Sequence, residues 1–203
     1  MRITKIILIF CLCAISILIL TAERTWAHLP VFKIGGNENF SRAQEIFKPE
    51  TAQMIFGKLE EGKTDFYKFK IYDHFSLHIQ ILTPKNKKYS DFRPTLAILG
   101  PGLKKTEDYL PFFIEEKLGA LILHDKQKIP RETFFDYETL TSYFKGGKIR
   151  HYLTEPGEYW LAVFNLENKS GTYAIRLSDK EDWRLSAVIN RIKGFFRIKL
   201  ELY

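Results

Sequence analysis

Residues 152–178 are Tyr-Leu-Thr-Glu-Pro-Gly-Glu-Tyr-Trp-Leu-Ala-Val-Phe-Asn-Leu-Glu-Asn-Lys-Ser-Gly-Thr-Tyr-Ala-Ile-Arg-Leu-Ser. Apolar side chains fill both sides of 159–164, which is typical of an interior strand covered on both faces. In 172–177, Tyr, Ile and Leu alternate with Thr, Ala and Arg, which indicates a strand with one wetter face. Turn residues stand at Pro156-Gly157 and Ser170-Gly171. The stretch predicts a β-hairpin at the centre of an all-β sandwich.

The rest of the chain adds strands on the N-terminal side of this stretch. The clearest alternates Phe, Leu and Ile with Ser, His and Gln over 75–81. Strands are also expected over 52–59, 65–71, 95–99, 119–123 and 149–153, with an edge segment over 28–34. Ser41 and Glu45 suit a short helix over 41–45, whereas 103–118 and 125–147 are expected to be irregular. The predicted fold is a jelly-roll-like antiparallel β-sandwich of about eight or nine strands, with a short N-terminal helix and a C-terminal amphipathic helix.

The first 27 residues have the pattern of an export signal. Arg2 and Lys5 precede the apolar run 6–20, and Thr25-Trp26-Ala27 offers a cleavage site. Fifteen helical residues span about 22 Å, less than the roughly 30 Å of a hydrocarbon core, so cleavage is favoured over retention as an anchor. The sequence therefore predicts a signal peptide (1–27), a sandwich domain (28–183) and a basic tail (184–203), in an exported protein that is periplasmic, cell-surface or extracellular.

The predicted cut changes the composition of the mature protein. Cys11 and Cys13 are the only cysteines and both lie in the apolar run, so the mature domain must fold without disulfides. The formal charge of +7 falls by two, because three basic residues and one acidic residue are removed. The remaining basic residues are dispersed. Export and dispersion together exclude nucleic acid as a partner, and a basic surface favours anionic envelope surfaces.

The C-terminal tail changes from the period of a strand to that of a helix. Its apolar residues recur at spacings of three and four: Leu185, Val188, Ile189, Ile192, Phe195 and Phe196. Basic residues occupy the other angles. Two placements follow. The tail packs on the sandwich, or it lies on an anionic membrane with Phe195 and Phe196 inserted between Arg191 and Arg197.

Two pairs of segments resemble the pre-peptidase C-terminal (PPC) family. The first pair is Gly57-Lys-Leu59 with Asp65-Phe-Tyr-Lys-Phe69, and the second is 156–164 with Gly171-Thr-Tyr-Ala-Ile175. They are similar to that family's "G-x-L … D-x-Y-x-F" and "P-G-x-Y-x-L-x-V … G-x-Y-x-L" strands over roughly residues 51–178. The segments 100–103 and 134–143 are also similar to an uncharacterised group of exported microbial proteins with this sandwich. The resemblance implies a non-catalytic domain, often an accessory to secreted enzymes, with calcium bound in some relatives.

No catalytic motif stands out, and two metals remain as alternatives. The chain has no Gly-x-Ser-x-Gly elbow and no His-Glu-x-x-His. Cleavage after Ala27 would make His28 the first mature residue, whose imidazole and free amine can chelate Cu(II) if the fold supplies a second histidine. Acidic residues near the hairpin (155, 158, 179, 181 and 182) show no firm ligand spacing for calcium. Copper and calcium are kept beside the expectation of no cofactor.

An aromatic segment is the candidate ligand-binding region. Phe134, Phe135, Tyr137 and Tyr143 lie close together in the sequence and suit either a stacking platform for sugars or a buried patch under a loop. The sequence thus favours an exported, non-catalytic binding or accessory protein whose partner is a protein, a glycan or an envelope surface. The alternative is a copper protein built on His28.

Overall fold

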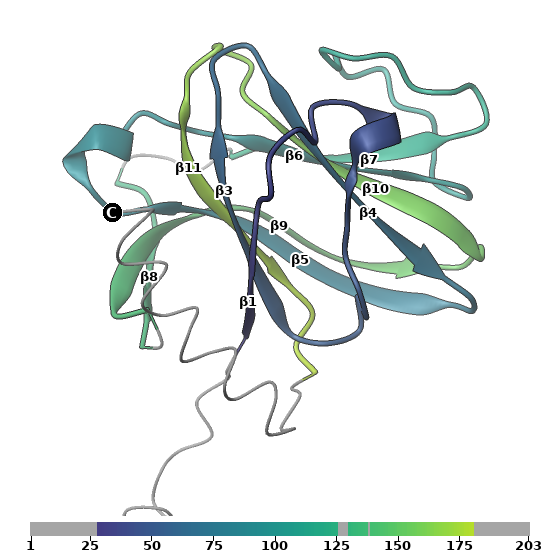
Figure 1. Ribbon diagram of the computed structural model, residues 1–203, viewed down its shortest axis with the longest axis horizontal. Helices are drawn as coiled ribbons and strands as arrows, with labels where there is room; N and C mark the ends of the chain where they lie inside the picture. The colour runs from purple at the N-terminus through teal and green to yellow at the C-terminus, as the bar shows by residue number, and fades with distance from the viewer. Residues whose placement is uncertain (1–27, 126–129, 138, 181–203) are drawn as a thin grey trace, which may run out of the picture.

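The computed structural model describes residues 28–125, 130–137 and 139–180 (Figure 1). The predicted signal peptide and the predicted C-terminal helix lie outside these residues. The strands are β1 (Leu29–Phe32), β2 (Gln44–Glu45), β3 (Gln53–Leu59), β4 (Thr64–Ile71), β5 (Phe75–Pro84), β6 (Thr95–Gly100), β7 (Gly119–Leu123), β8 (Thr133–Asp136), β9 (Thr141–Leu153), β10 (Gly157–Phe164) and β11 (Gly171–Leu177). Two short 3-10 helices, η1 (Phe40–Arg42) and η2 (Lys87–Tyr89), complete the described elements.

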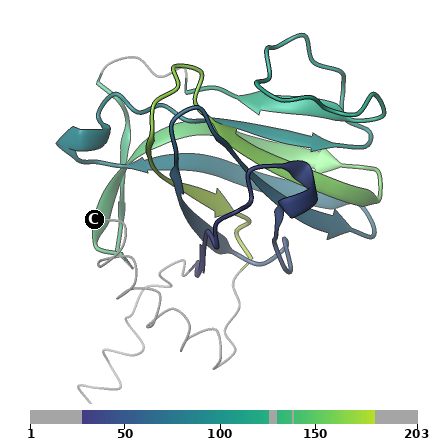
Figure 2. The ribbon, with the colours of Figure 1, turned by 45° about the horizontal axis from the view of Figure 1, so that its top comes forward.

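The strands form two sheets packed face to face (Figures 1 and 2). One sheet has six strands in the order β1-β3-β11-β5-β9-β8, and the other has five in the order β2-β4-β10-β6-β7. The pairing is antiparallel except at one edge of each sheet, where β1 joins β3 and β2 joins β4 in parallel. The predicted β-sandwich is confirmed. The described residues hold eleven strands instead of eight or nine.

The predicted hairpin at 159–177 is wrong in its pairing. Both runs are strands, but β10 lies between β4 and β6 in the five-stranded sheet, whereas β11 lies between β3 and β5 in the six-stranded sheet. The loop between them therefore crosses from one sheet to the other. Alternation of side chains shows which face of a strand is buried but not which strand lies beside it, so the local pattern could not distinguish the two arrangements.

The region expected to be irregular, 125–147, contains β8 and the first half of β9. Strand β9 runs for 13 residues with Gly146-Gly147 at its middle. A β-carbon at Gly146 would lie 2.8 Å from the Ile81 side chain, and one at Gly147 would lie 2.8 Å from Leu123. The pairing of β5 with β9 shifts register next to this point. Close backbone approach thus requires the two glycines, and they interrupt the alternation that would have revealed the strand.

The helix expected over 41–45 is a single 3-10 turn. The side chain of Asn39, not Ser41, caps it by accepting from the Arg42 N–H at 3.0 Å. The backbone has left the helical conformation at Ala43, with φ −52° and ψ 129°, and Gln44 then pairs with Tyr67 of β4. The Phe40 ring packs 4.6 Å from the Phe66 ring. Edge pairing and this aromatic contact end the turn after three residues.

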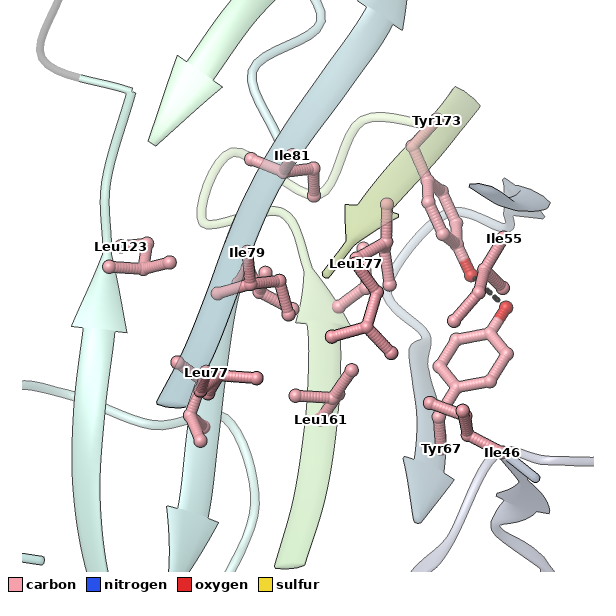
Figure 3. Packing of buried hydrophobic residues seen from close by; sticks show 14 of the residues in the cluster. Ile46, Ile55, Tyr67, Leu77, Ile79, Ile81, Leu123, Leu161, Tyr173 and Leu177 are labelled. Carbon is pink, nitrogen blue, oxygen red and sulfur yellow. Dashed lines mark hydrogen bonds between the residues drawn. The ribbon is translucent and has the colours of Figure 1, made fainter. Parts of the chain in front are cut away.

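The core lies between the two sheets (Figure 3). It is built from one face of each alternating strand, including Ile55, Tyr67, Leu77, Ile79, Ile81, Leu161, Tyr173, Ile175 and Leu177, all at most 2% exposed. Burial of this many large apolar side chains is the dominant stabilising contribution to folding. Over the described ranges, no helix is both long and apolar enough to cross a membrane.

Candidate functional site

The predicted aromatic segment is divided between two surfaces. Tyr143, 1% exposed, packs with Met54, Phe56, Leu82 and Ala174, and Phe134 lies against the same group. Phe135 and Tyr137 are 43% and 73% exposed. The alternation of β8 separates the residues, since Phe134 and Phe135 are neighbours and must point to opposite faces. The segment therefore provides one buried residue, Tyr143, with the partly buried Phe134 beside it, and one exposed pair.

The exposed pair forms an aromatic corner at the end of β8, the last strand of the six-stranded sheet, with Phe135 on the strand and Tyr137 just after it. The ring centroids of Phe135 and Tyr137 are 4.9 Å apart and the ring planes meet at 85°. Strand β8 pairs only with β9 among the described strands. An edge strand can accept an added strand from a partner, with side-chain pockets beside it selecting the partner's residues. The Tyr137 hydroxyl adds a polar group to the corner.

The start of β8 is held by a buried ion pair. Arg131 donates through Nη2 to Asp125 Oδ2 at 2.7 Å and to Thr83 Oγ1 at 3.0 Å. Its guanidinium also lies 4.5 Å from the centroid of the Phe144 ring on β9. The Arg131 and Asp125 side chains are only 4% and 1% exposed. These contacts tie the approach to β8 to β5 and β9 and so fix where the aromatic corner sits.

His28, the predicted copper ligand, is 8% exposed. Its Nε2 accepts from Arg176 Nε on β11 at 3.1 Å. Among the described residues, no group of three or more His, Cys, Asp and Glu side chains converges as a metal site. The structure thus brings His28 to a cationic partner on the sheet. Copper at His28 and calcium at the acidic residues stay predictions.

A charged cluster, unforeseen from the sequence, extends from His28 across the outward face of the six-stranded sheet. Asp179 Oδ2 lies 2.6 Å from His78 Nδ1 and 3.6 Å from Arg150 Nη2, and its Oδ1 lies 3.6 Å from Arg176 Nη2. Partial burial raises the pKa of Asp179, but the His78 hydrogen bond and the nearby arginines outweigh this effect and lower it overall. The register that places His78 opposite Arg150 creates the cluster, and sequence spacing gives no sign of it.

A second polar network is buried between the sheets. Asp65 is fully buried, pairs with Lys33 Nζ at 2.5 Å and accepts from the Tyr173 hydroxyl at 2.7 Å. The Tyr67 and Tyr173 hydroxyls are 2.7 Å apart (Figure 3). Burial raises the pKa of Asp65, opposed by Lys33 and Tyr173, and burial also raises the pKa of both tyrosines. Such a largely enclosed network, with only the Lys33 side chain partly exposed, acts on stability and on strand register.

The four tail residues predicted to meet a membrane surface (Arg191, Phe195, Phe196 and Arg197) lie outside the described residues. Their placement is not tested by the geometry above. The peripheral membrane contact stays a prediction.

Comparison with known proteins finds similar solved structures at low sequence identity. No family model matches the chain, and no curated protein matches it. One similar solved structure is the pre-peptidase C-terminal domain of collagenase from Bacillus anthracis, 17% identical, with a TM-score of 0.35 over 67% of this chain and 94% of that chain. Another is PliG from Salmonella Typhimurium, a periplasmic inhibitor of g-type lysozyme, 14% identical, with a TM-score of 0.35 over 67% and 97% of the two chains. The first of these is a domain of the family that residues 51–178 resemble.

Proposed function

We propose that this chain is an exported, non-catalytic β-sandwich that binds a partner protein in the cell envelope or the extracellular space. The observation that carries the proposal is the aromatic corner: Phe135 on the edge strand β8 and Tyr137 directly after it are both exposed. Large exposed aromatic side chains are enriched in binding surfaces because they bury much area with few rotatable bonds. The apolar run at 6–20 supports export.

The shape of the corner favours a protein over a glycan. Rings that meet at 85° do not form a continuous flat platform, so only one of them can stack on a given sugar. The same two rings enclose an angle that suits an aliphatic or aromatic side chain. An extended partner segment alongside β8 would add main-chain hydrogen bonds to this contact. The partner segment we expect is therefore extended and carries an apolar side chain.

The polar side chains of the described residues support a binding role over a catalytic one. Asp65 and its tyrosines are enclosed in the core, and Arg131 and Asp125 are almost fully buried. Asp179 is partly exposed, but its hydrogen bond with His78 and the nearby Arg176 and Arg150 hold its pKa low. A carboxylate held charged in this way is a poor general acid or base near neutral pH.

The test compares two surface variants of the mature protein. Immobilised wild type should retain a partner from the host's envelope fraction, and Phe135→Ala/Tyr137→Ala should lose it. Tyr72→Ala is the matched control, because Tyr72 is 81% exposed and lies after β4, away from β8 in the chain. Equal retention by the aromatic-corner variant, retention of polysaccharide alone, or turnover of a substrate by the purified protein would refute the proposal. Mass spectrometry should find His28 at the mature N-terminus.

A further inference from the structure

The outward face of the six-stranded sheet carries an apolar group that is buried like a core. We call Met54, Phe56, Leu82, Tyr143 and Ala174 the outer cluster; they are 6%, 2%, 1%, 1% and 0% exposed. They alternate with residues of the central core, such as Ile55 and Ile175, and so point away from the other sheet. A sheet face this apolar normally lies against another layer.

The described elements do not supply that layer. The eleven described strands are all within the two sheets. Of the two described 3-10 helices, η1 packs Phe40 on the opposite side of the sandwich, and η2 contributes Tyr89 to the central core. Only the partly buried Phe32 and Phe134, among the described residues grouped with the outer cluster, lie at its margins. The cover then comes from outside the described residues, and the segment after residue 180 is the candidate because Lys180 lies beside the start of β3.

The described chain ends next to this face. Ala52 N–H donates to the Lys180 carbonyl at 2.6 Å, and Lys180 is bridged to Thr51, just before β3. Met54 is three residues further on, about 10 Å along the strand. Ser178 has a positive φ of 61° and its hydroxyl donates to the Glu50 carbonyl, which turns the chain as it leaves β11. Residue 181 therefore starts within reach of the outer cluster.

We propose that residues 185–196 cover the outer cluster as a third layer of the fold. The apolar residues of this segment recur at helical spacing and form one stripe. Twelve helical residues extend about 18 Å, and the five strands from β1 to β9 are about 19 Å across at the spacing of paired strands. Leu185, Ile189, Ile192 and Phe196 lie on the stripe and Asn190 lies on the opposite side. This inference goes beyond the proposed binding role and does not depend on it.

Disulfide trapping in the full chain tests the contact directly. Cys11 and Cys13 are replaced by Ser, and Met54→Cys is combined in turn with Ile189→Cys, Ile192→Cys or Asn190→Cys. Intramolecular disulfides should form with 189 or 192 at least tenfold faster than with 190, read as a mobility shift without reductant. Lys68→Cys on β4, in the other sheet, is the control partner.

The outcomes are distinguishable. Equal rates for 190 and 192, or equal trapping by Lys68→Cys and Met54→Cys, would overturn the proposal. Disulfide-linked dimers in place of monomers would also overturn it, because they identify a second copy as the cover.

A second measurement avoids substitution of Met54. Ile192→Glu should raise the hydrogen-exchange rates of amides in β3 and β11, and Asn190→Glu should not. Unchanged exchange in Ile192→Glu would contradict the proposed cover.

Discussion

Both outward faces of the sandwich carry a buried apolar group, and the two groups differ in what covers them. On the five-stranded sheet, Phe66 and Phe164 point outward and are buried under rings from outside the sheet, with Phe40 at 4.6 Å from Phe66 and Phe112 at 5.0 Å from Phe66. On the six-stranded sheet, the outer cluster is equally buried. Here we place the cover in residues 185–196.

The comparison shows what apolar side chains on both sides of a strand mean in this sandwich. One side faces the core between the sheets, and the other side needs a third layer over the outward face. For β10, that layer is the loop from β6 to β7 together with η1. For β3, β5 and β11, the described chain offers only side chains at the margin. If both faces are covered in this way, a partner has to meet side chains on the loops and edges of the sandwich, such as those at the end of β8.

The largest expected losses of stability come from truncating a buried phenylalanine on each outward face. Phe66→Ala and Phe56→Ala should each lower the free energy of unfolding by about 3 to 5 kcal/mol, the range for a buried phenylalanine. Urea denaturation of the full chain measures both. Phe113→Ala, at a side chain 80% exposed, should stay within about 0.5 kcal/mol. If Phe56→Ala behaved like the control, the two faces would not be equivalent.

Replacing a carboxylate inside the sandwich should lower the free energy of unfolding more than replacing one on its outward face. Asp65→Asn removes the partner of Lys33 within the core and should cost about 3 to 5 kcal/mol. Asp179→Asn acts on a partly exposed cluster and should cost no more than about 1 kcal/mol, because solvent screens the charges. If the two variants lost similar amounts of stability, the partly exposed charges around Asp179 would stabilise the fold more than solvent screening permits, and this account of the cluster would be wrong.

The pH dependence of folding stability tests whether the charged form of Asp179 stabilises the fold. Its pKa is lowered by His78, Arg176 and Arg150 despite partial burial, so its charged form stabilises the folded state. This stability is present above the pKa of an unfolded aspartate and is lost as the pH falls through the lowered folded value. Below about pH 4, wild type should lose stability more steeply than Asp179→Asn. Parallel curves in acid titrations followed by circular dichroism would contradict this assignment.

The smallest effect on stability is expected at the aromatic corner. Phe135→Ala/Tyr137→Ala should change the free energy of unfolding by about 0.5 kcal/mol or less per residue, because both side chains are substantially exposed. Thermal unfolding monitored by circular dichroism measures it. A large loss of stability would assign the pair to the cover of the sheet instead of to a binding edge.

Alternation of side chains predicted most of the strands, and contacts between distant strands limited what else could be predicted. The run 75–81 was expected and is within β5, and 119–123 is β7. The partners of β10 and β11 were wrong, since both strands already have two neighbours supplied by distant parts of the chain. Strand β8 and the first half of β9 were missed, whereas 149–153 was expected and is the end of β9. In β9 the alternation breaks at Gly146-Gly147, which meets Ile81 and Leu123 at a close approach.

The candidate site could be predicted only in part for the same reason. Exposure separates Phe135 and Tyr137 from Phe134 and Tyr143, and it depends on which face of β8 turns toward the sheet. The cluster around Asp179 depends on the register of three strands and on the turn after β11. Neither can be derived from spacing along the sequence.

The central claim is that the outward face of the six-stranded sheet is completed by the C-terminal segment. A double-mutant cycle tests it, with Phe56→Ala and Ile192→Ala alone and together, and Phe66→Ala in place of Phe56→Ala as the matched control. Urea unfolding should give a coupling energy of about 1 to 2 kcal/mol between positions 56 and 192, as for residues in contact, and about zero between 66 and 192. Additive effects of Phe56→Ala and Ile192→Ala would contradict the claim.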